Sequence, residues 1–128
     1  MKKNELVAEW LKRAASNLAR ARYGLVSDEV LYEDLCFDCQ QAVEKSLKAV
    51  LIKNDISFPK THSLNYLLDI LRDNKIDVPE NLNKAVFLNE YAIESRYPGN
   101  YEPVTEADYK ESLEIAESIY KFVISVIK

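Results

Sequence analysis

Hydrophobic positions recur three or four residues apart along most of the chain, the spacing that places side chains on one face of an α-helix. This pattern predicts four long helices, at about residues 4–25, 31–53, 79 to 96 or 97, and 105–127, and a short one that begins near Ser63. Only two glycines and four prolines interrupt the 128 residues. The sequence therefore predicts an all-α fold, an up-and-down four-helix bundle with a fifth short helix.

Each predicted helix has an apolar face, and its ends carry matching signals. Thr61 and Ser63 are candidate N-caps of the short helix, and Thr105, followed by Asp108, forms a capping-box pattern for the last one. Gly24 is expected to close the first helix, and Pro79 suits the first turn of the fourth. The four faces with the clearest spacing are Leu6, Trp10, Ala14, Leu18, Ala21 and Leu25; Cys36, Cys39, Val43, Leu47 and Val50; Leu64, Leu67, Leu68 and Leu71; and Tyr109, Leu113, Ala116, Tyr120, Val123 and Ile127.

Length and composition favour one domain over residues 1–128, with 48% hydrophobic residues to fill its core. No stretch approaches the roughly 20 apolar residues of a membrane span, and the first residues lack the apolar centre of a signal peptide. We therefore expect a cytoplasmic protein with no membrane association.

The net charge of −4 argues against a protein that coats nucleic acid by charge alone. The charge is uneven, because residues 1–25 hold six basic and two acidic side chains. The first helix is therefore either a patch for phosphates or an ordinary solvated face. The polar residues of the second helix, Gln40, Gln41, Glu44, Lys45 and Lys48, are interpreted as a solvated or inter-subunit face without chemistry.

Several catalytic and metal-binding arrangements are absent from the sequence. A di-metal bundle needs Glu-x-x-His pairs on two helices, and His62 is the single histidine. Cys36 and Cys39 have C-x-x-C spacing, but a structural zinc needs four ligands, so two small buried residues are the better interpretation. With Gly24 and Gly99 as the only glycines, no glycine-rich phosphate loop is possible. We expect neither a metal nor a cofactor.

The end of the fourth predicted helix is unusual. At α-helical spacing, Asn89 and Arg96 share the face that Leu82, Val86 and Ile93 should bury. An isolated buried charge is costly, so a guanidinium there must be paired or reach water.

Arg96 has two interpretations. It either turns outward or pairs with a carboxylate at the helix end, where it complements the helix dipole, or it offers its planar donor fork to a phosphate or another anion. In the second case, Tyr97 and Tyr101 are candidate stacking or hydrogen-bonding walls.

The chain resembles the HEPN domain, a nucleotide-binding domain of higher eukaryotes and prokaryotes, over essentially its whole length. The resemblance is carried by WLKRAASNLARAR at residues 10–22, DCQQAVEKSLKAVL at 38–51, KTHSLNYLL at 60–68 and SRYPG at 95–99. The Gln-Gln-Ala-x-Glu-Lys-x-Leu-Lys-Ala run is the most specific of these. The resemblance implies a five-helix bundle, often dimeric, that associates with nucleotides or RNA.

Some members of the family resemble toxin ribonucleases that work beside a small nucleotidyltransferase antitoxin. In those, an arginine late in the fourth helix is followed a few positions later by a histidine, and the pair acts on the RNA phosphodiester. Arg96 matches the arginine, but Asn100 or Tyr101 stands where the histidine would be. A phenol is a poor general base at neutral pH, so the sequence leaves enzymatic activity open.

Three hypotheses follow from the residues and the resemblance. The first is a module that binds a nucleotide or RNA through Arg96, Tyr97, Asn89 and Tyr101, acts with a small nucleotidyltransferase-like protein and forms a homodimer. The second is a metal-independent ribonuclease toxin of a toxin–antitoxin pair, in which Tyr101 or His62 replaces the missing histidine or another subunit completes the site. The third is a dimerising scaffold without a ligand.

Overall fold

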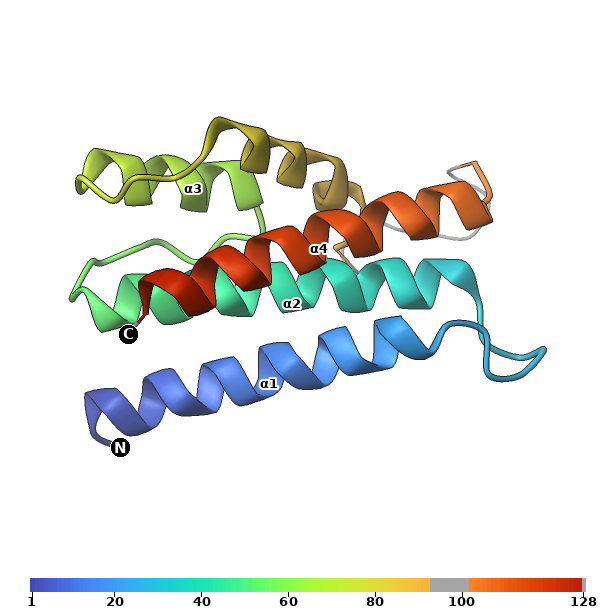
Figure 1. Ribbon diagram of the computed structural model, residues 1–128, viewed down its shortest axis with the longest axis horizontal. Coiled ribbons are helices and arrows are strands. Elements are labelled where there is room, and N and C mark those ends of the chain that lie inside the picture. The colour runs from blue at the N-terminus through green and yellow to red at the C-terminus, as the bar shows by residue number, and fades with distance from the viewer. Residues whose placement is uncertain (93–101, 128) are drawn as a thin grey trace.

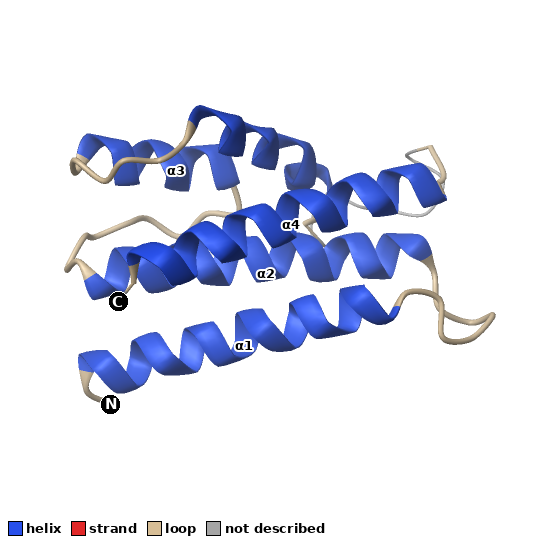
Figure 2. Ribbon diagram, viewed as in Figure 1, coloured by secondary structure: helices blue, strands red, loops and turns tan. Residues whose placement is uncertain are grey.

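A computed structural model describes residues 1–92 and 102–127 of the chain (Figure 1). All regular elements in these two ranges are helical, as the sequence predicts (Figure 2). They are α1 (Lys3–Tyr23), α2 (Tyr32–Lys53), α3 (Leu64–Asp73), the 3-10 helix η1 (Glu80–Tyr91) and α4 (Glu106–Val126). The long elements α1, α2, η1 and α4 alternate in direction along the bundle, and the short α3 lies beside η1 (Figure 1).

Helix α2 is the centre of the molecule, because it contacts each of the other four elements. Its predicted face of Cys36, Cys39, Val43, Leu47 and Val50 is buried throughout. Side chains on its other faces are buried as well, among them Ala49 and Leu51. A helix that is enclosed on most sides also places some of its polar residues inside the protein. These buried polar residues form the candidate functional site.

The predicted apolar faces of the other α-helices are largely confirmed. In α3, Leu64, Leu67, Leu68 and Leu71 are all fully buried. In α1, the buried residues include Ala14, Leu18 and Ala21, and in α4 they include Tyr109, Ala116 and Val123. The prediction for Leu25 is wrong, because α1 ends at Tyr23 and Leu25 is 46% exposed.

The helix ends follow the predicted signals. Gly24 stops α1 with a φ of 69°, a left-handed conformation that glycine adopts without strain. Ser63 is the N-cap of α3, and its hydroxyl accepts a hydrogen bond from the Tyr66 amide at 3.4 Å. At α4, the Thr105 hydroxyl accepts from the Asp108 amide at 3.1 Å, and the Asp108 carboxylate accepts from the Thr105 amide at 3.0 Å. This reciprocal pair is the predicted capping box.

The fourth element differs from the prediction in type and length. It is a 3-10 helix that ends at Tyr91, and Ala92 is already extended with a ψ of 132°. The prediction of an α-helix is therefore wrong for the described part of this segment, up to Ala92, and its continuation to Arg96 lies outside the described residues. The buried residues of η1 are Leu82, Ala85, Leu88 and Tyr91, three apart, as expected for three residues per turn. Val86 is 46% exposed, and its predicted place on the buried face is wrong.

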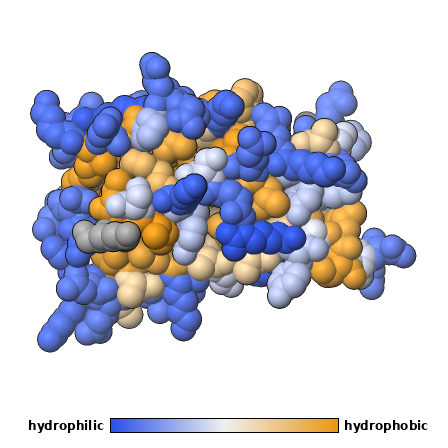
Figure 3. All heavy atoms as spheres, viewed as in Figure 1, coloured by the Kyte–Doolittle hydropathy of each residue, from blue (hydrophilic) through white to orange (hydrophobic). Residues whose placement is uncertain are grey.

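Polar side chains cover much of the face shown in Figure 3, with apolar patches between them. Within the described ranges, no helix combines the length and the apolar character that a membrane span requires.

Candidate functional site

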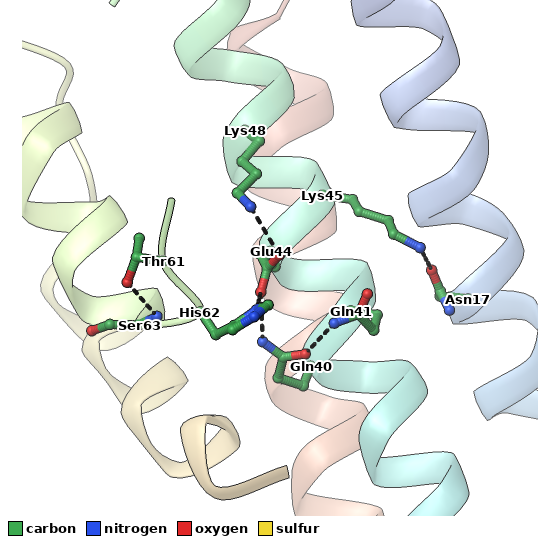
Figure 4. A network of polar contacts seen from close by, with 9 residues as sticks. All are labelled: Asn17, Gln40, Gln41, Glu44, Lys45, Lys48, Thr61, His62 and Ser63. Carbon is green, nitrogen blue, oxygen red and sulfur yellow. Dashed lines mark hydrogen bonds and ion pairs between the residues drawn. The ribbon is translucent and has the colours of Figure 1, made fainter. Parts of the chain in front are cut away.

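The polar residues of α2 do not form a solvated face. Gln40 is 0% exposed and Glu44 is 5% exposed, so the predicted solvated or inter-subunit surface is wrong for both. The α-helical spacing of four places them one turn apart on the side of α2 that faces the turn before α3 (Figure 4). Because buried polar groups need hydrogen-bond partners, their contacts define the first candidate site.

Glu44 is the centre of this site (Figure 4). Its Oε1 accepts a hydrogen bond from Gln40 Nε2 at 2.9 Å and lies 2.8 Å from His62 Nδ1. Its Oε2 accepts from Lys48 Nζ at 2.9 Å. Gln41 extends the chain of contacts by donating to Gln40 Oε1 at 2.7 Å. We call Gln40, Gln41, Glu44, Lys48 and His62 the Glu44 network.

The Glu44 network keeps its central carboxylate ionised. Burial by itself would raise the pKa of Glu44, but the hydrogen bonds from Gln40, His62 and Lys48 outweigh burial and lower that pKa. Lys48 is enclosed as well, since its ammonium lies 6.0 Å from the ring centre of Trp10 and 5.9 Å from that of Phe58. Two aromatic faces and one carboxylate therefore hold this cation in place.

His62 occupies the turn that leads into α3. Its side chain is 40% exposed, and the turn is held by a hydrogen bond from the Ser63 amide to Thr61 Oγ1 at 3.0 Å. Because Glu44 is ionised, Nδ1 of His62 carries the proton that faces the carboxylate. A carboxylate that orients an imidazole in this way is the arrangement used by general-base histidines. Sequence reasoning left His62 unattached because its partner lies 18 residues away on another element.

A second network joins α1 to α2. Asn17 donates to Asp38 Oδ1 at 2.9 Å, and Arg20 lies 3.2 Å from the same oxygen. Lys45 donates to Asn17 Oδ1 at 2.8 Å. Burial and the nearby Arg13 lower the pKa of Lys45, with Arg20 adding to the effect. Three cations thus lie near one another on this side of the bundle, and Asn17 and Asp38 beneath them are buried.

Of the predicted site residues, Asn89 is the one that the structure describes. Its Oδ1 accepts a hydrogen bond from the Leu64 amide at 2.9 Å, and its Nδ2 donates to Asn65 Oδ1 at 2.8 Å. The side chain therefore satisfies a free amide at the start of α3 and fastens the last turn of η1 to the turn that holds His62. Arg96, Tyr97 and Tyr101 lie outside the described residues.

The two cysteines lie in the core. Cys36 and Cys39 are both fully buried, and burial raises the pKa of the Cys39 thiol. Their C-x-x-C spacing thus places two small apolar groups inside the bundle. Over residues 1–92 and 102–127, no three His, Cys, Asp or Glu side chains gather closely enough to hold a metal ion.

The arrangement of α2, the turn before α3 and the Asn89 anchor can be compared with known proteins. The family model described as HEPN domain matches residues 7–126. This chain belongs to the HEPN family. The match confirms the family that residues 10–22, 38–51, 60–68 and 95–99 indicate.

Relatives of this HEPN domain include a curated protein and two crystal structures. "Putative toxin MJ1304" from Methanocaldococcus jannaschii is 29% identical over 93% of this chain and 86% of its own length. The structure titled "Crystal Structure of ST0689, an archaeal HEPN homologue" is 32% identical, covers all of both chains and gives a TM-score of 0.77. TT1696 from Thermus thermophilus is 33% identical over 93% of this chain and 96% of that one, with a TM-score of 0.76.

The residues that carry the HEPN resemblance are also the ones that form the two networks. Asp38, Gln40, Glu44 and Lys48 lie within the 38–51 run, and His62 lies within the 60–68 run. Their contacts explain in physical terms why polar residues occupy these positions of α2 and of the turn before α3. The Gln-Gln-Ala-x-Glu-Lys run is therefore the sequence signal for a buried polar network.

Proposed function

We propose that this HEPN domain is a binding module for RNA or a nucleotide, which it holds through Arg96 with Asn89, Tyr97 and Tyr101. We further propose that it forms a homodimer and acts with a small nucleotidyltransferase-like protein. Arg96 supplies a planar, permanently charged donor fork that suits a phosphate, and the two tyrosines supply rings for a base or sugar. Family membership supports this function.

The Asn89 anchor is the observation that carries the proposal. Its hydrogen bonds to Leu64 and Asn65 fasten the C-terminal turn of η1 beside His62 and the Glu44 network. The segment that carries Arg96 starts from this turn, at Ala92. A segment that is anchored at one end loses less conformational entropy on binding a ligand than a segment without an anchor. The Asn89 anchor therefore supports binding at this place.

The test measures affinity with matched arginine variants. Fluorescence anisotropy with a labelled single-stranded RNA, and thermal shifts with nucleoside mono- and triphosphates, are recorded for wild type, Arg96→Ala, Arg96→Lys and the surface control Lys121→Ala. We expect Arg96→Ala to weaken binding at least tenfold, Arg96→Lys to be intermediate, and Lys121→Ala to match wild type. Equal affinity of wild type and Arg96→Ala would overturn the proposal.

The Glu44–His62 pair favours a second candidate, a metal-independent ribonuclease. A half-exposed imidazole oriented by an ionised carboxylate has the form of a general base, and it would replace the histidine missing after Arg96. The name of the Methanocaldococcus jannaschii relative is consistent with a toxin role.

Cleavage of labelled RNA in EDTA separates the two candidates. If this domain is a ribonuclease, His62→Gln should slow cleavage by roughly 10²- to 10⁴-fold while RNA affinity stays near that of wild type. Intact RNA with wild-type protein leaves binding as the function. A stable complex with a nucleotidyltransferase-like protein that survives Arg96→Ala, together with no response to any RNA or nucleotide, would instead select the scaffold.

A further inference from the structure

A cavity of about 540 Å³ lies where the end of α1, the turn after it and the start of α2 meet. Tyr23, Val26, Leu35 and Phe37 form its apolar walls. Tyr23 is 77% exposed and Val26 is 69% exposed, so much of this wall faces solvent. Figure 3 shows apolar surface at the same end of the molecule. The volume falls within the range of small-molecule sites, and the walls suit a flat apolar group.

The polar part of the cavity lining has an unusual feature. Asp38, whose side chain is 4% exposed, receives both Asn17 and Arg20 on its Oδ1. Among the described residues, no donor forms a hydrogen bond to its Oδ2. A buried carboxylate oxygen without a hydrogen-bond donor is costly, and a donor that binds there would remove that cost. Asp38 thus offers an acceptor within a cavity that has room for a donor.

The charges of the lining indicate which part of a ligand fits. Asp34 and Asp38 outnumber the single cation, Arg20. A phosphate inside the cavity would face two carboxylates, whereas an amino group would find an acceptor. Arg20 is 67% exposed, and Arg13 lies seven residues earlier on α1, about two helical turns and roughly 10 Å away along the same face. This arrangement suits a nucleotide whose base lies inside the cavity, near the acceptor, and whose phosphate lies outside it, near the cations.

We propose that this cavity takes one base with an exocyclic amino group, whether from RNA or a free nucleoside, stacked on Tyr23 and donating to Asp38 Oδ2. In RNA, Arg20, Arg13 and Lys45 then contact the neighbouring phosphates along α1. Stacking of an unpaired base on aromatic rings and hydrogen bonding at its edge are the usual means of single-strand recognition. This inference rests on the proposed function and adds a second contact region to it, apart from Arg96.

The test is a titration of the 128-residue protein with matched nucleosides. Binding is measured from the amide signals of the cavity residues in nitrogen–proton correlation spectra. Adenosine is compared with purine riboside, which lacks the amino group, and cytidine with uridine. We expect adenosine and cytidine to bind about tenfold more tightly than their partners, the difference that one hydrogen bond to a charged group makes. Shifted signals should include those of Tyr23, Val26 and Asp38.

Variants test the two contacts separately. Tyr23→Ala should weaken every nucleoside that binds, while Tyr66→Ala, which removes another exposed tyrosine, should match wild type. Asp38→Asn keeps the shape and should abolish the preference for adenosine over purine riboside. Equal binding within both nucleoside pairs, or equal effects of Tyr23→Ala and Tyr66→Ala, would overturn the inference.

RNA binding distinguishes failure of this inference from failure of the proposed function. If RNA affinity depends on Arg96 but nucleosides leave the cavity signals unmoved, the cavity is not a base site and the proposed function stands. If nucleosides shift the cavity signals with the expected preference, but RNA does not bind wild type, the base site stands for free nucleosides and the RNA-binding role fails.

Discussion

Glu44 is a buried carboxylate that three other side chains contact inside the bundle. Its carboxylate is 5% exposed, yet Lys48, Gln40 and His62 each lie within 2.9 Å of one of its oxygens. A buried ion pair adds little stability over an apolar pair, but removing one partner leaves the other charge unpaired. The Glu44 network therefore makes stability depend on one side chain and holds His62 in one orientation.

Replacing Glu44 should destabilise the fold strongly. Glu44→Gln keeps the shape but leaves Lys48, 12% exposed, without its counter-ion, so we expect a loss of roughly 2–4 kcal/mol in the free energy of unfolding. Glu9→Gln removes a carboxylate with an exposed arginine partner, Arg13, and should cost less than about 0.5 kcal/mol. Urea unfolding followed by circular dichroism measures both. Similar losses in the two variants would show that the buried network contributes no more than a surface pair.

The same carboxylate predicts a pH dependence. The pKa of Glu44 is lowered from its ordinary value of 4.5, so the folded protein binds this proton more weakly than the unfolded chain does. Its contribution is present above about pH 4.5 and is lost as the pH falls through the folded-state pKa. The stability difference between wild type and Glu44→Gln should therefore shrink between roughly pH 5 and pH 3. Glu117, whose pKa is lowered by its hydrogen bond from Arg22, affects both proteins alike. A constant difference over this range would contradict the assignment.

Residue patterns in the sequence could not show the partners of these polar side chains. Gln40, Glu44 and Lys48 have the spacing of an ordinary solvated helix face, and spacing alone favours that interpretation. They are buried because the turn before α3 covers them, and the contact of Glu44 with His62 spans 18 residues. Periodicity reports the faces of one helix, whereas burial depends on which other elements cover each face.

At the scale of elements, local signals predicted most of the fold. The Gly24 stop, the Ser63 cap and the Thr105–Asp108 capping box are set by neighbouring residues, and the structure confirms all three predictions. Helix η1 was not, because its apolar residues fit both a spacing of three and a mixture of three and four. Choosing Leu82, Val86 and Asn89 gave an α-helix, and choosing Leu82, Ala85 and Leu88 gives the observed 3-10 helix.

Two substitutions in η1 distinguish these spacings. Leu88→Ala removes a fully buried side chain and should cost roughly 2–5 kcal/mol of stability. Val86→Ala removes one that is 46% exposed and should cost less than about 1 kcal/mol, although the predicted α-helix would bury it. Thermal and urea unfolding of the two variants side by side gives the answer. A larger loss of stability for Val86→Ala than for Leu88→Ala would contradict the 3-10 spacing and favour the α-helical one.

At the scale of the whole molecule, charge is divided between the helices. Residues 1–25 hold six basic and two acidic side chains, while α4 begins with a run of acidic positions at Glu106, Asp108, Glu111, Glu114 and Glu117. The paired hydrogen bonds of Arg22 to Glu117, at 2.5 Å and 2.9 Å, connect the two sets. Under the proposed function, an RNA strand should be attracted to the α1 side and repelled by α4. This asymmetry would let a chain with net charge −4 offer a path to phosphates.

The salt dependence of RNA binding reports which cations touch phosphates. For a single strand, the logarithm of the binding constant falls with the logarithm of salt concentration by about 0.7 for each phosphate neutralised. If the strand follows α1, Arg13→Gln should reduce the magnitude of this slope by about 0.7, whereas Lys121→Gln on α4 should leave it unchanged. Anisotropy titrations of a labelled single-stranded RNA over a series of salt concentrations give both slopes. A slope that responds to Lys121→Gln and not to Arg13→Gln would contradict this path and place the strand against the acidic helix α4. Local contacts would then have to outweigh the electrostatic repulsion between the phosphates and the carboxylates of α4.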